Sequence, residues 1–150
     1  QMHPKYPFWS AATITNPNRL RGDLELLPKL AENGLCIAGK DISMVGIIGT
    51  TLMLLETSNS GAMLDLDAIP RLPEIPFDRW LVSFPSYRFL LSVHPDRVST
   101  VEQLFRDRQI TCTDIGEVTD NSQLIIKDRQ ASTMFWDFDC EHLTGFGTTT

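Results

Sequence analysis

Apolar residues recur every three to four positions in several stretches of the chain, which is the spacing of amphipathic helices. The first stretch follows Asn16, a capping residue with a proline after it, and ends at Gly34. Because Pro28 interrupts the pattern, we expect a kink or a restart of the helix near Leu27. The apolar face of this helix is predicted to be Leu20, Leu24, Leu27 and Ala31.

A second helical pattern runs from Met44 to about Thr57 and differs from the first, because its apolar residues occupy most of the helix circumference. A helix that is apolar on nearly all sides is buried on nearly all sides. We therefore expect this segment to be the central helix of the domain. Two shorter helices are predicted at residues 77–84 and 96–108, and the apolar face of the second is predicted to be Val98, Val101, Leu104 and Phe105.

Other stretches read as strands. Apolar and polar residues alternate at residues 62–69 and 87–93, and a short apolar run at residues 35–39 predicts a buried strand. Helices that alternate with strands early, followed by a strand meander, indicate a mixed β-sheet covered by helices, in an α+β or α/β domain. The meander is predicted near residues 110–118, 123–128 and 132–138.

Composition limits the class of protein. The 150 residues are enough for one domain with one core, and the 42% of hydrophobic residues are typical of a globular chain. The formal net charge of -6 argues against nucleic acid as the main partner, and no apolar run is long enough to span a membrane. Three widely spaced cysteines favour neither a zinc site nor a disulfide framework, so we expect reduced thiols and a cytoplasmic location.

The start of the central helix carries the candidate chemistry. Two glycines early in a helix are unfavourable by roughly 1 kcal/mol each relative to alanine, so Gly46 and Gly49 need a reason. With Ser43 as the N-cap, the N–H groups of Met44, Val45 and Gly46 are expected to point out of the helix unpaired, where a phosphate or carboxylate binds well. In this hypothesis Gly46 leaves room for the anion.

Two charged residues precede this helix start. Lys40 is placed to supply a countercharge to an anion. Asp41 has three possible roles: it accepts a hydrogen bond from a sugar hydroxyl, holds a metal-bound water, or only fixes the turn. The alternative for the whole segment is structural, with the glycines allowing close packing and the polar residues serving as caps. The segment matches neither a Walker A loop nor the GxGxxG fingerprint.

Two passages carry a resemblance to a known family. The passage KDISMVGIIGTTLMLLETSNSGAMLDLDAIP resembles the C-terminal domain of the AIR synthase-related (PurM-like) superfamily, in which a short D-[IVP]-[ST]-x-G-G-[LI] turn opens a long apolar helix. The passage FPSYRFLLSVHPDRVSTVEQLFRDRQITCTDIGEVTD is similar to the succession that follows in that family. The resemblance covers about residues 18–128 and implies the α+β fold of that C-terminal domain.

The resemblance also implies a function. Members of the family bind ATP and Mg²⁺ mainly through an N-terminal domain that this chain lacks, and the C-terminal domain closes a cleft against it. The resemblance therefore implies that Asp41, Ser43 and Gly46 face the cleft and help to hold a phosphorylated small-molecule substrate or nucleotide. It further implies a homodimer in the full-length protein, and a chain that is inactive without its N-terminal domain and contains no catalytic or metal-binding residue of its own.

Two residues depart from the family pattern. Val45 stands where the family often has its first glycine, and it narrows the expected anion pocket. Arg88 stands where a glycine often precedes the FLL sequence, and it either supplies a compensating positive charge or reaches solvent. Both departures favour the rival hypothesis, a non-catalytic ligand-binding or dimer scaffold module of the same fold.

The expected organisation has three parts: an N-terminal extension or interdomain segment at residues 1–17, the domain at residues 18–140, and a flexible tail at residues 141–150. The aromatic residues 6–9 are expected either to dock on the domain or to cover a junction with a missing domain, and the chain is expected to be part of a longer protein. The remaining candidates are expected to have structural or solvent-exposed roles, and Asp65 and Asp67 are expected to keep an edge strand soluble rather than to bind a cation. These remaining candidates are the separated His3, His94 and His142, the pairs Asp65 and Asp67 and Asp137 and Asp139, and Cys112.

Overall fold

Two units make up the part of the chain that the structure describes, which is residues 8–9 and 16–146 of a computed structural model. Unit 1 contains residues 1–50 and 71–112, and unit 2 contains residues 51–70 and 113–150. The division falls inside helix α3 (Gly46–Ser58), so this helix starts in one unit and ends in the other.

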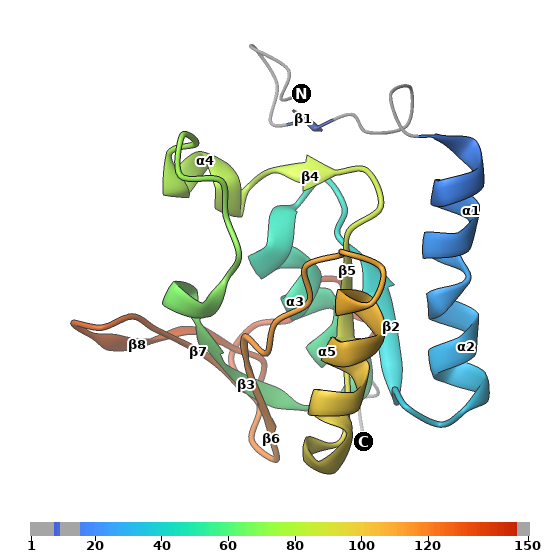
Figure 1. Ribbon diagram of the computed structural model, residues 1–150. Helices are drawn as coiled ribbons and strands as arrows, with labels where there is room; N and C mark the ends of the chain where they lie inside the picture. The colour runs from blue at the N-terminus through green and yellow to red at the C-terminus, as the bar shows by residue number, and fades with distance from the viewer. Residues whose placement is uncertain (1–7, 10–15, 147–150) are drawn as a thin grey trace. The chain divides into compact units, whose positions relative to one another are not determined.

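Unit 1 begins with two short helices that follow each other along one line, α1 (Pro17–Leu24) and α2 (Leu26–Glu32), as Figure 1 shows. The predicted cap is confirmed, because the Asn16 side chain accepts hydrogen bonds from the N–H groups of Asn18 and Arg19. Gly34 has the predicted positive φ of 62°.

The predicted apolar face of this helix is only half right. Leu20 and Leu24 are half-buried as expected, but the second helix buries Leu26 and Leu30 while Ala31 is exposed. The reason is that the break comes at Glu25, before Pro28, so α2 starts a new helical register there.

The strands of unit 1 form two short ribbons. Strand β2 (Ala38–Asp41) pairs antiparallel with β5 (Phe89–Ser92), and β1 (Phe8–Trp9) pairs parallel with β4 (Phe84–Pro85). The predicted strand at residues 35–39 is therefore displaced towards Asp41, and its residues alternate between half-buried and exposed positions. A two-stranded ribbon leaves one face open to solvent, and the run of apolar residues in the sequence did not predict this exposure.

Helix α3 starts later than predicted, at Gly46. Its first residue has a φ of 68°, and a β-carbon there would overlap the carbonyl oxygen of Leu81 and lie 2.7 Å from the Cα atom of Val82. These two residues end helix α4 (Phe77–Leu81) and follow it. Only glycine tolerates both this backbone conformation and this close approach.

Unit 1 is completed by helix α5 (Val98–Arg106), which a short 3₁₀ turn, η2 (Pro95–Arg97), introduces. Val101 is the buried residue of α5, in agreement with the predicted apolar face. The side chain of Arg108, just after α5, donates a hydrogen bond of 2.6 Å to Asp23 in α1.

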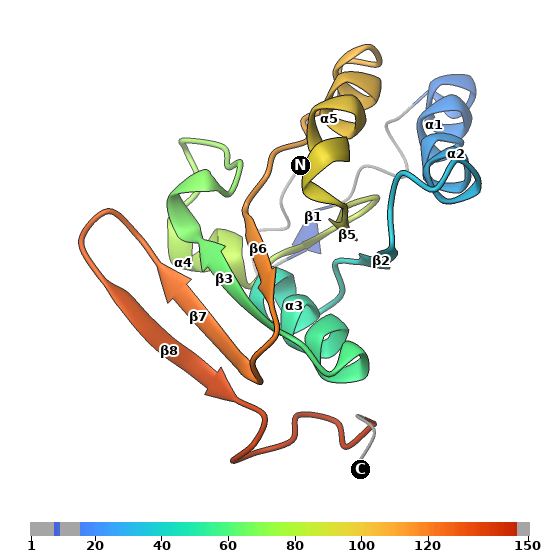
Figure 2. The same cartoon turned by 90° about the horizontal axis from the view of Figure 1, so that it is seen from below.

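Unit 2 is built around a four-stranded sheet in the order β6-β3-β7-β8, which Figure 2 shows. The central pair β3 (Gly61–Asp65) and β7 (Gln123–Lys127) is parallel, whereas β6 (Gly116–Thr119) and β8 (Ser132–Asp137) pair antiparallel at the two edges. The prediction of a mixed sheet is confirmed. Leu64 and Leu124, on the central strands, are buried in its core.

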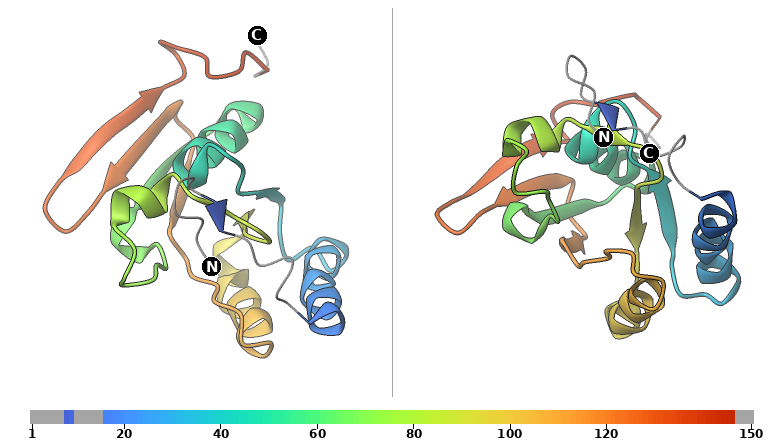
Figure 3. Two further views of the ribbon diagram at one scale, coloured as in Figure 1. Left: turned by 90° about the horizontal axis from the view of Figure 1, so that it is seen from above. Right: turned by 45° about the horizontal axis from the view of Figure 1, so that its top comes forward.

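Two details of the sheet differ from the prediction. Strand β3 ends at Asp65, because this side chain accepts a hydrogen bond from the N–H of Asp67 and a 3₁₀ turn, η1 (Leu66–Ala68), follows. Strands β7 and β8 form the hairpin visible in Figure 3, and its pairing is interrupted by a register shift beside Leu124 and Ile125. The first predicted strand of the meander is shorter than expected and begins at Gly116.

A buried carboxylate holds the end of the described chain. Glu56, on α3, is only 3% exposed, and its oxygens accept hydrogen bonds from the N–H groups of Leu143 (2.8 Å), Thr144 (2.9 Å) and Gly145 (3.2 Å). The Thr144 hydroxyl also donates to it. These hydrogen bonds connect residues 143–145 of the predicted tail to α3, and residues 147–150 lie outside the described part.

The hydrogen bonds from Thr144, Gly145 and Leu143 lower the pKa of Glu56 below its ordinary value of 4.5, against the opposing effect of burial. A carboxyl group with a lowered pKa stabilises the folded state above its ordinary pKa, and this stability is lost as the pH falls through the folded-state pKa. Its influence therefore lies in the acidic range, below about pH 4.5.

We predict that Gly46→Ala lowers the free energy of unfolding by about 3 kcal/mol. The new methyl group would overlap the end of α4, and the alanine backbone would have to adopt a positive φ. Gly34→Ala is the control, since Gly34 has nearly the same φ but no atom within 4 Å of its β-carbon position. It should lose only about 1 kcal/mol. Urea unfolding measures both variants, and equal losses would contradict the packing role of Gly46.

We predict that Glu56→Gln weakens the acid dependence of stability, because the variant lacks the carboxylate whose protonation releases residues 143–145. The midpoint of urea unfolding, followed between pH 7 and pH 3, tests this. The exposed Glu141→Gln is the matched control and should keep the acid dependence of the unchanged protein. An unaltered pH profile in Glu56→Gln would show that the carboxylate does not hold the tail.

Candidate functional site

The β2–β5 ribbon brings distant candidate residues together. Lys40 and Asp41, at the end of β2, lie opposite Leu90 and Phe89 of β5. One step further, the N–H of Ile42 donates a hydrogen bond of 2.9 Å to the carbonyl oxygen of Arg88. Arg88 therefore lies beside the connection between β2 and α3, which we call the α3 turn (residues 42–45).

The α3 turn does not have the predicted cap. Helix α3 begins at Gly46, and the N–H of Gly46 donates to the carbonyl oxygen of Ser43 at 3.0 Å, so this amide is paired rather than free. The N–H of Ser43 in turn donates to the hydroxyl of Thr50 at 3.2 Å. The assignment of Ser43 as N-cap is therefore wrong, because the chain forms a closed turn before the helix starts.

Two amides remain available for an anion. Met44 and Val45 are 76% and 47% exposed, and neither N–H group donates a hydrogen bond within the described part of the chain. The predicted opening at Gly46 is not present, since backbone atoms of Leu81 and Val82 fill the space beside it. The structural alternative is thus correct for Gly46, while Met44 and Val45 are exposed at the turn.

Gly49 also has a packing explanation. A β-carbon at Gly49 would lie 2.6 Å from the β-carbon of Val45, one helical turn earlier. The absence of a side chain at Gly49 thus makes room for Val45, the residue that replaces a family glycine. The large side chain of Val45 is accommodated because Gly49 has none.

Arg88 is held by an aromatic ring. Its guanidinium carbon lies 4.1 Å from the centre of the Trp80 ring, within the range of a cation–π interaction, and Trp80 is buried. Burial of the guanidinium lowers the pKa of Arg88, although it stays charged near neutral pH. Tyr87, immediately before it, has a φ of 64°, which is rare for an aromatic residue.

Trp80 and Tyr87 are residues that sequence reasoning did not connect to the site. The arginine at position 88, where the family often has glycine, was the available signal for such a contact, because a guanidinium group often packs against an aromatic ring. Charge at the site is partly balanced locally, since the Lys40 ammonium lies 3.7 Å from the Asp41 carboxylate. Asp41 is exposed and Lys40 is half-buried.

The other candidates have local partners. Asp65 lies 3.6 Å from Lys127, and Asp67 accepts a hydrogen bond from the N–H of Arg129. Asp65 ends an interior strand, so its predicted role on an edge strand is wrong. Burial and the nearby Glu102 raise the pKa of Cys112, which does not favour a nucleophile. No group of three metal-ligating side chains occurs among the described residues.

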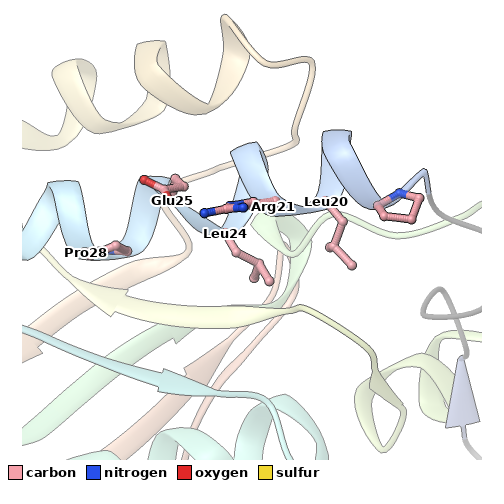
Figure 4. Close-up of a pocket in the computed structure, with 6 residues that line it drawn as sticks. Leu20, Arg21, Leu24, Glu25 and Pro28 are labelled. Atoms are coloured by element: carbon pink, nitrogen blue, oxygen red, sulfur yellow. The ribbon is translucent and has the colours of Figure 1, made fainter.

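Two surface hollows occur among the described residues. A hollow of about 440 Å³ runs along α1 and the start of α2, where Figure 4 shows Leu20 and Leu24 on one side of the helix. A second, of about 340 Å³, lies in unit 2 beside Asp65, Asp114 and Glu117. Neither contains a residue of the predicted site. Among the described residues, the helices are too short or too polar to cross a bilayer.

Comparison with known families assigns the class of protein. Residues 5–129 match the model of the family described as AIR synthase related protein, C-terminal domain. The chain therefore belongs to this family, and the resemblance seen in its sequence is confirmed.

Three relatives illustrate the extent of the match. The uncharacterised protein sll0787 of Synechocystis is 49% identical over 95% of this chain, and the uncharacterised protein MJ0640 of Methanocaldococcus jannaschii is 32% identical over 97%. The phosphoribosylformylglycinamidine synthase subunit PurL of Beijerinckia indica is 30% identical over 69%. The chain spans 45% of the length of the first two relatives and 14% of the third.

Solved structures share the fold. The T. maritima PurL complexed with ATP superposes with a TM-score of 0.69 at 23% identity, over 78% of this chain and 20% of that one. A chain of the HypE–HypF complex superposes with a TM-score of 0.65 at 18% identity, over 79% and 41%. The predicted α+β fold of a PurM-like C-terminal domain is therefore confirmed.

We predict that Arg88→Lys lowers the free energy of unfolding by about 1 kcal/mol, because an ammonium group does not stack on Trp80 as the planar guanidinium does. The exposed Arg97, which pairs with its neighbour Asp96 at 3.2 Å, supplies the control variant Arg97→Lys, with little change expected. Urea unfolding measures both. Equal stability of the two variants would argue that Trp80 does not hold Arg88.

Proposed function

We propose that this chain is the C-terminal domain of an ATP-dependent, AIR synthase-related enzyme, in which it forms one wall of the cleft for nucleotide and substrate. In the proposed reaction ATP activates an oxygen of a small substrate by phosphoryl transfer, before a nucleophile displaces it. The domain binds and orients the phosphorylated substrate, and the preceding domain supplies most of the contacts to ATP and Mg²⁺. The chain alone is inactive.

The proposal rests on one observation: the hydrogen bond from the N–H of Ile42 to the backbone carbonyl oxygen of Arg88 joins the segment before β5 to the exposed α3 turn. An anion at this turn would meet the N–H groups of Met44 and Val45, which donate to no other described residue. Lys40, on β2, and Arg88, just before β5, add positive charge, and backbone amides with nearby cations are a common way to bind phosphate.

The roles of the individual residues follow from their positions. Met44 and Val45 donate N–H groups, Ser43 and Gly46 shape the turn, and Arg88 attracts the phosphate. Asp41, exposed at the end of β2, accepts a hydrogen bond from a sugar hydroxyl of the substrate or nucleotide, or from a water bound to Mg²⁺. The names of the PurL structures, one of them complexed with ATP, support nucleotide chemistry in the full-length protein.

The same proposal includes the partner and the location. The chain spans less than half of the length of sll0787 and MJ0640, which supports a preceding domain as its partner in a longer protein. A homodimer and a cytoplasmic location follow from the resemblance to the family and are part of the proposal.

The second candidate is a non-catalytic scaffold with the same fold. Val45 favours it, because its side chain occupies the space beside Gly49 and makes the α3 turn less open than a glycine would. A scaffold would keep the fold and the surface for its partner but would not turn over ATP.

We predict that the full-length protein hydrolyses ATP in the presence of Mg²⁺ and substrate, and that Asp41→Ala lowers kcat/KM by about 10-fold to 100-fold because a contact to the bound ligand is lost. Asp139→Ala, an exposed aspartate in unit 2, is the matched control and should leave turnover unchanged. Nucleotide titration and phosphate release measure both. Absence of ATP binding and turnover in the unchanged protein would favour the scaffold.

A further inference from the structure

Strand β8 forms one edge of the sheet of unit 2, as Figure 2 shows. Among the described residues it pairs only with β7, so the backbone N–H and C=O groups along its outer side have no strand partner. With six residues it is the longest strand that the structure describes, and its first four residues are exposed. An open edge of this length is a template for pairing with another strand.

Strand β8 has little of the protection that edge strands usually have. Charged residues, prolines and bulges normally keep such edges from pairing. From Ser132 to Trp136 the strand contains neither a charge nor a proline, and Met134 and Phe135 are 55% and 45% exposed. The irregularity in the pairing with β7 leaves Phe135 as an extra residue between Met134 and Trp136. This extra residue is large and apolar, so it does not make the edge polar.

A row of apolar side chains ends at this edge. Met63, Ile125 and Met134 are cross-strand partners on β3, β7 and β8, so they lie on the same face of the sheet. It is the face opposite to that of the buried Leu124, because neighbouring residues of a strand point to opposite faces. Met63 and Ile125 are half-buried, whereas Met134 is exposed. A strand added beside β8 would cover this exposed end of the row.

The charges at the two ends of β8 are complementary to each other. Arg129 precedes the strand and Asp139 follows it; both are exposed, and they are equally far from Met134 along the chain. When two such strands pair antiparallel with Met134 opposite Met134, each Arg129 comes opposite the Asp139 of the other copy. Opposite charges at facing positions stabilise a strand pair. A parallel pair would bring the like-charged ends together.

We infer that β8 is a contact surface between two copies of this chain, in which the two edge strands pair antiparallel about a two-fold axis. Each strand then offers the other the same surface, as a two-fold symmetric contact requires, and two four-stranded sheets become one. Main-chain hydrogen bonds supply the attraction, and the charges of Arg129 and Asp139 set the direction. The inference gives the homodimer of the proposed function a contact surface and does not depend on the proposed reaction with ATP.

Photochemical cross-linking of the full-length protein tests the inference. The photoreactive residue p-benzoylphenylalanine replaces Phe135 in one variant and Phe146, which is 82% exposed in unit 2, in the control variant. Each variant is prepared with and without isotope labelling, and the two forms are mixed, allowed to exchange and irradiated. Peptides that join a labelled to an unlabelled chain report only contacts between copies. We expect position 135 to cross-link to residues 129–139 of the other copy, with a yield about tenfold above the control.

Substitutions on the cross-linking variant test the strand pairing itself. Met134→Lys puts a charge at the centre of the edge and should lower the yield between copies at least about tenfold. Val118→Lys, at a 57% exposed position on the opposite edge strand β6, is the matched control and should leave the yield unchanged. Arg129→Glu and Asp139→Arg should each lower the yield, and the two together should restore it.

Each outcome decides the inference. Yields between copies that are equal at positions 135 and 146, or cross-links only to residues outside 129–139, overturn it. An equal loss in Met134→Lys and Val118→Lys also overturns it, as does a double charge variant that restores nothing, because the contact would then not be an antiparallel pair of β8 strands. Cross-links that map to β8 and disappear in Met134→Lys support it even if the protein does not hydrolyse ATP. Failure of the proposed activity and failure of the strand contact are therefore distinguishable.

Discussion

The contact between Gly46 and the backbone at the end of α4 determines the geometry of the candidate site. Because no side chain fits there, the chain can form a closed turn before α3, with Gly46 bound to Ser43 and Ser43 bound to Thr50. This turn leaves Met44 and Val45 facing outward instead of in the first turn of the helix. The same contact places Val82 beside the turn.

Features that depend on local sequence were predictable. The capped first helix, the buried central helix, the face of α5 and the strands of the mixed sheet follow from capping residues and from apolar periodicity, which are properties of neighbouring residues. The family was also recognisable, because its sequence motifs extend over the whole central helix and beyond. The grouping of Asp41 and Arg88 in one candidate site came from those motifs and not from periodicity.

Features that depend on distant contacts were not predictable. Ser43 has the residue type of an N-cap, but the start of α3 is set by Leu81 and Val82, which are more than 30 residues away. The stacking of Arg88 on Trp80 and the anchoring of residues 143–145 by Glu56 have the same character. A buried glutamate in an apolar helix has no visible partner in sequence, because the partner is a set of backbone amides that any residue types supply.

Family membership and the proposed site rest on different numbers of residues. Family membership rests on residues 5–129, whereas β8 and the segment held by Glu56 lie beyond the matched region. The proposed ligand contacts rest on a few groups at the α3 turn, where Val45 and Arg88 differ from the family pattern. Replacement of a glycine by valine closes space, while a cation stacked on Trp80 adds attraction for an anion.

The most direct measurement of the central claim is the change in the amide NMR signals of the full-length protein when a non-hydrolysable ATP analogue and Mg²⁺ are added, with and without a phosphorylated substrate. If the α3 turn binds phosphate, the N–H signals of Met44 and Val45 shift strongly, while those of Val118 and Met134 in unit 2 stay in place. Shifts elsewhere in the protein that leave the signals of Met44 and Val45 unchanged would contradict the claim.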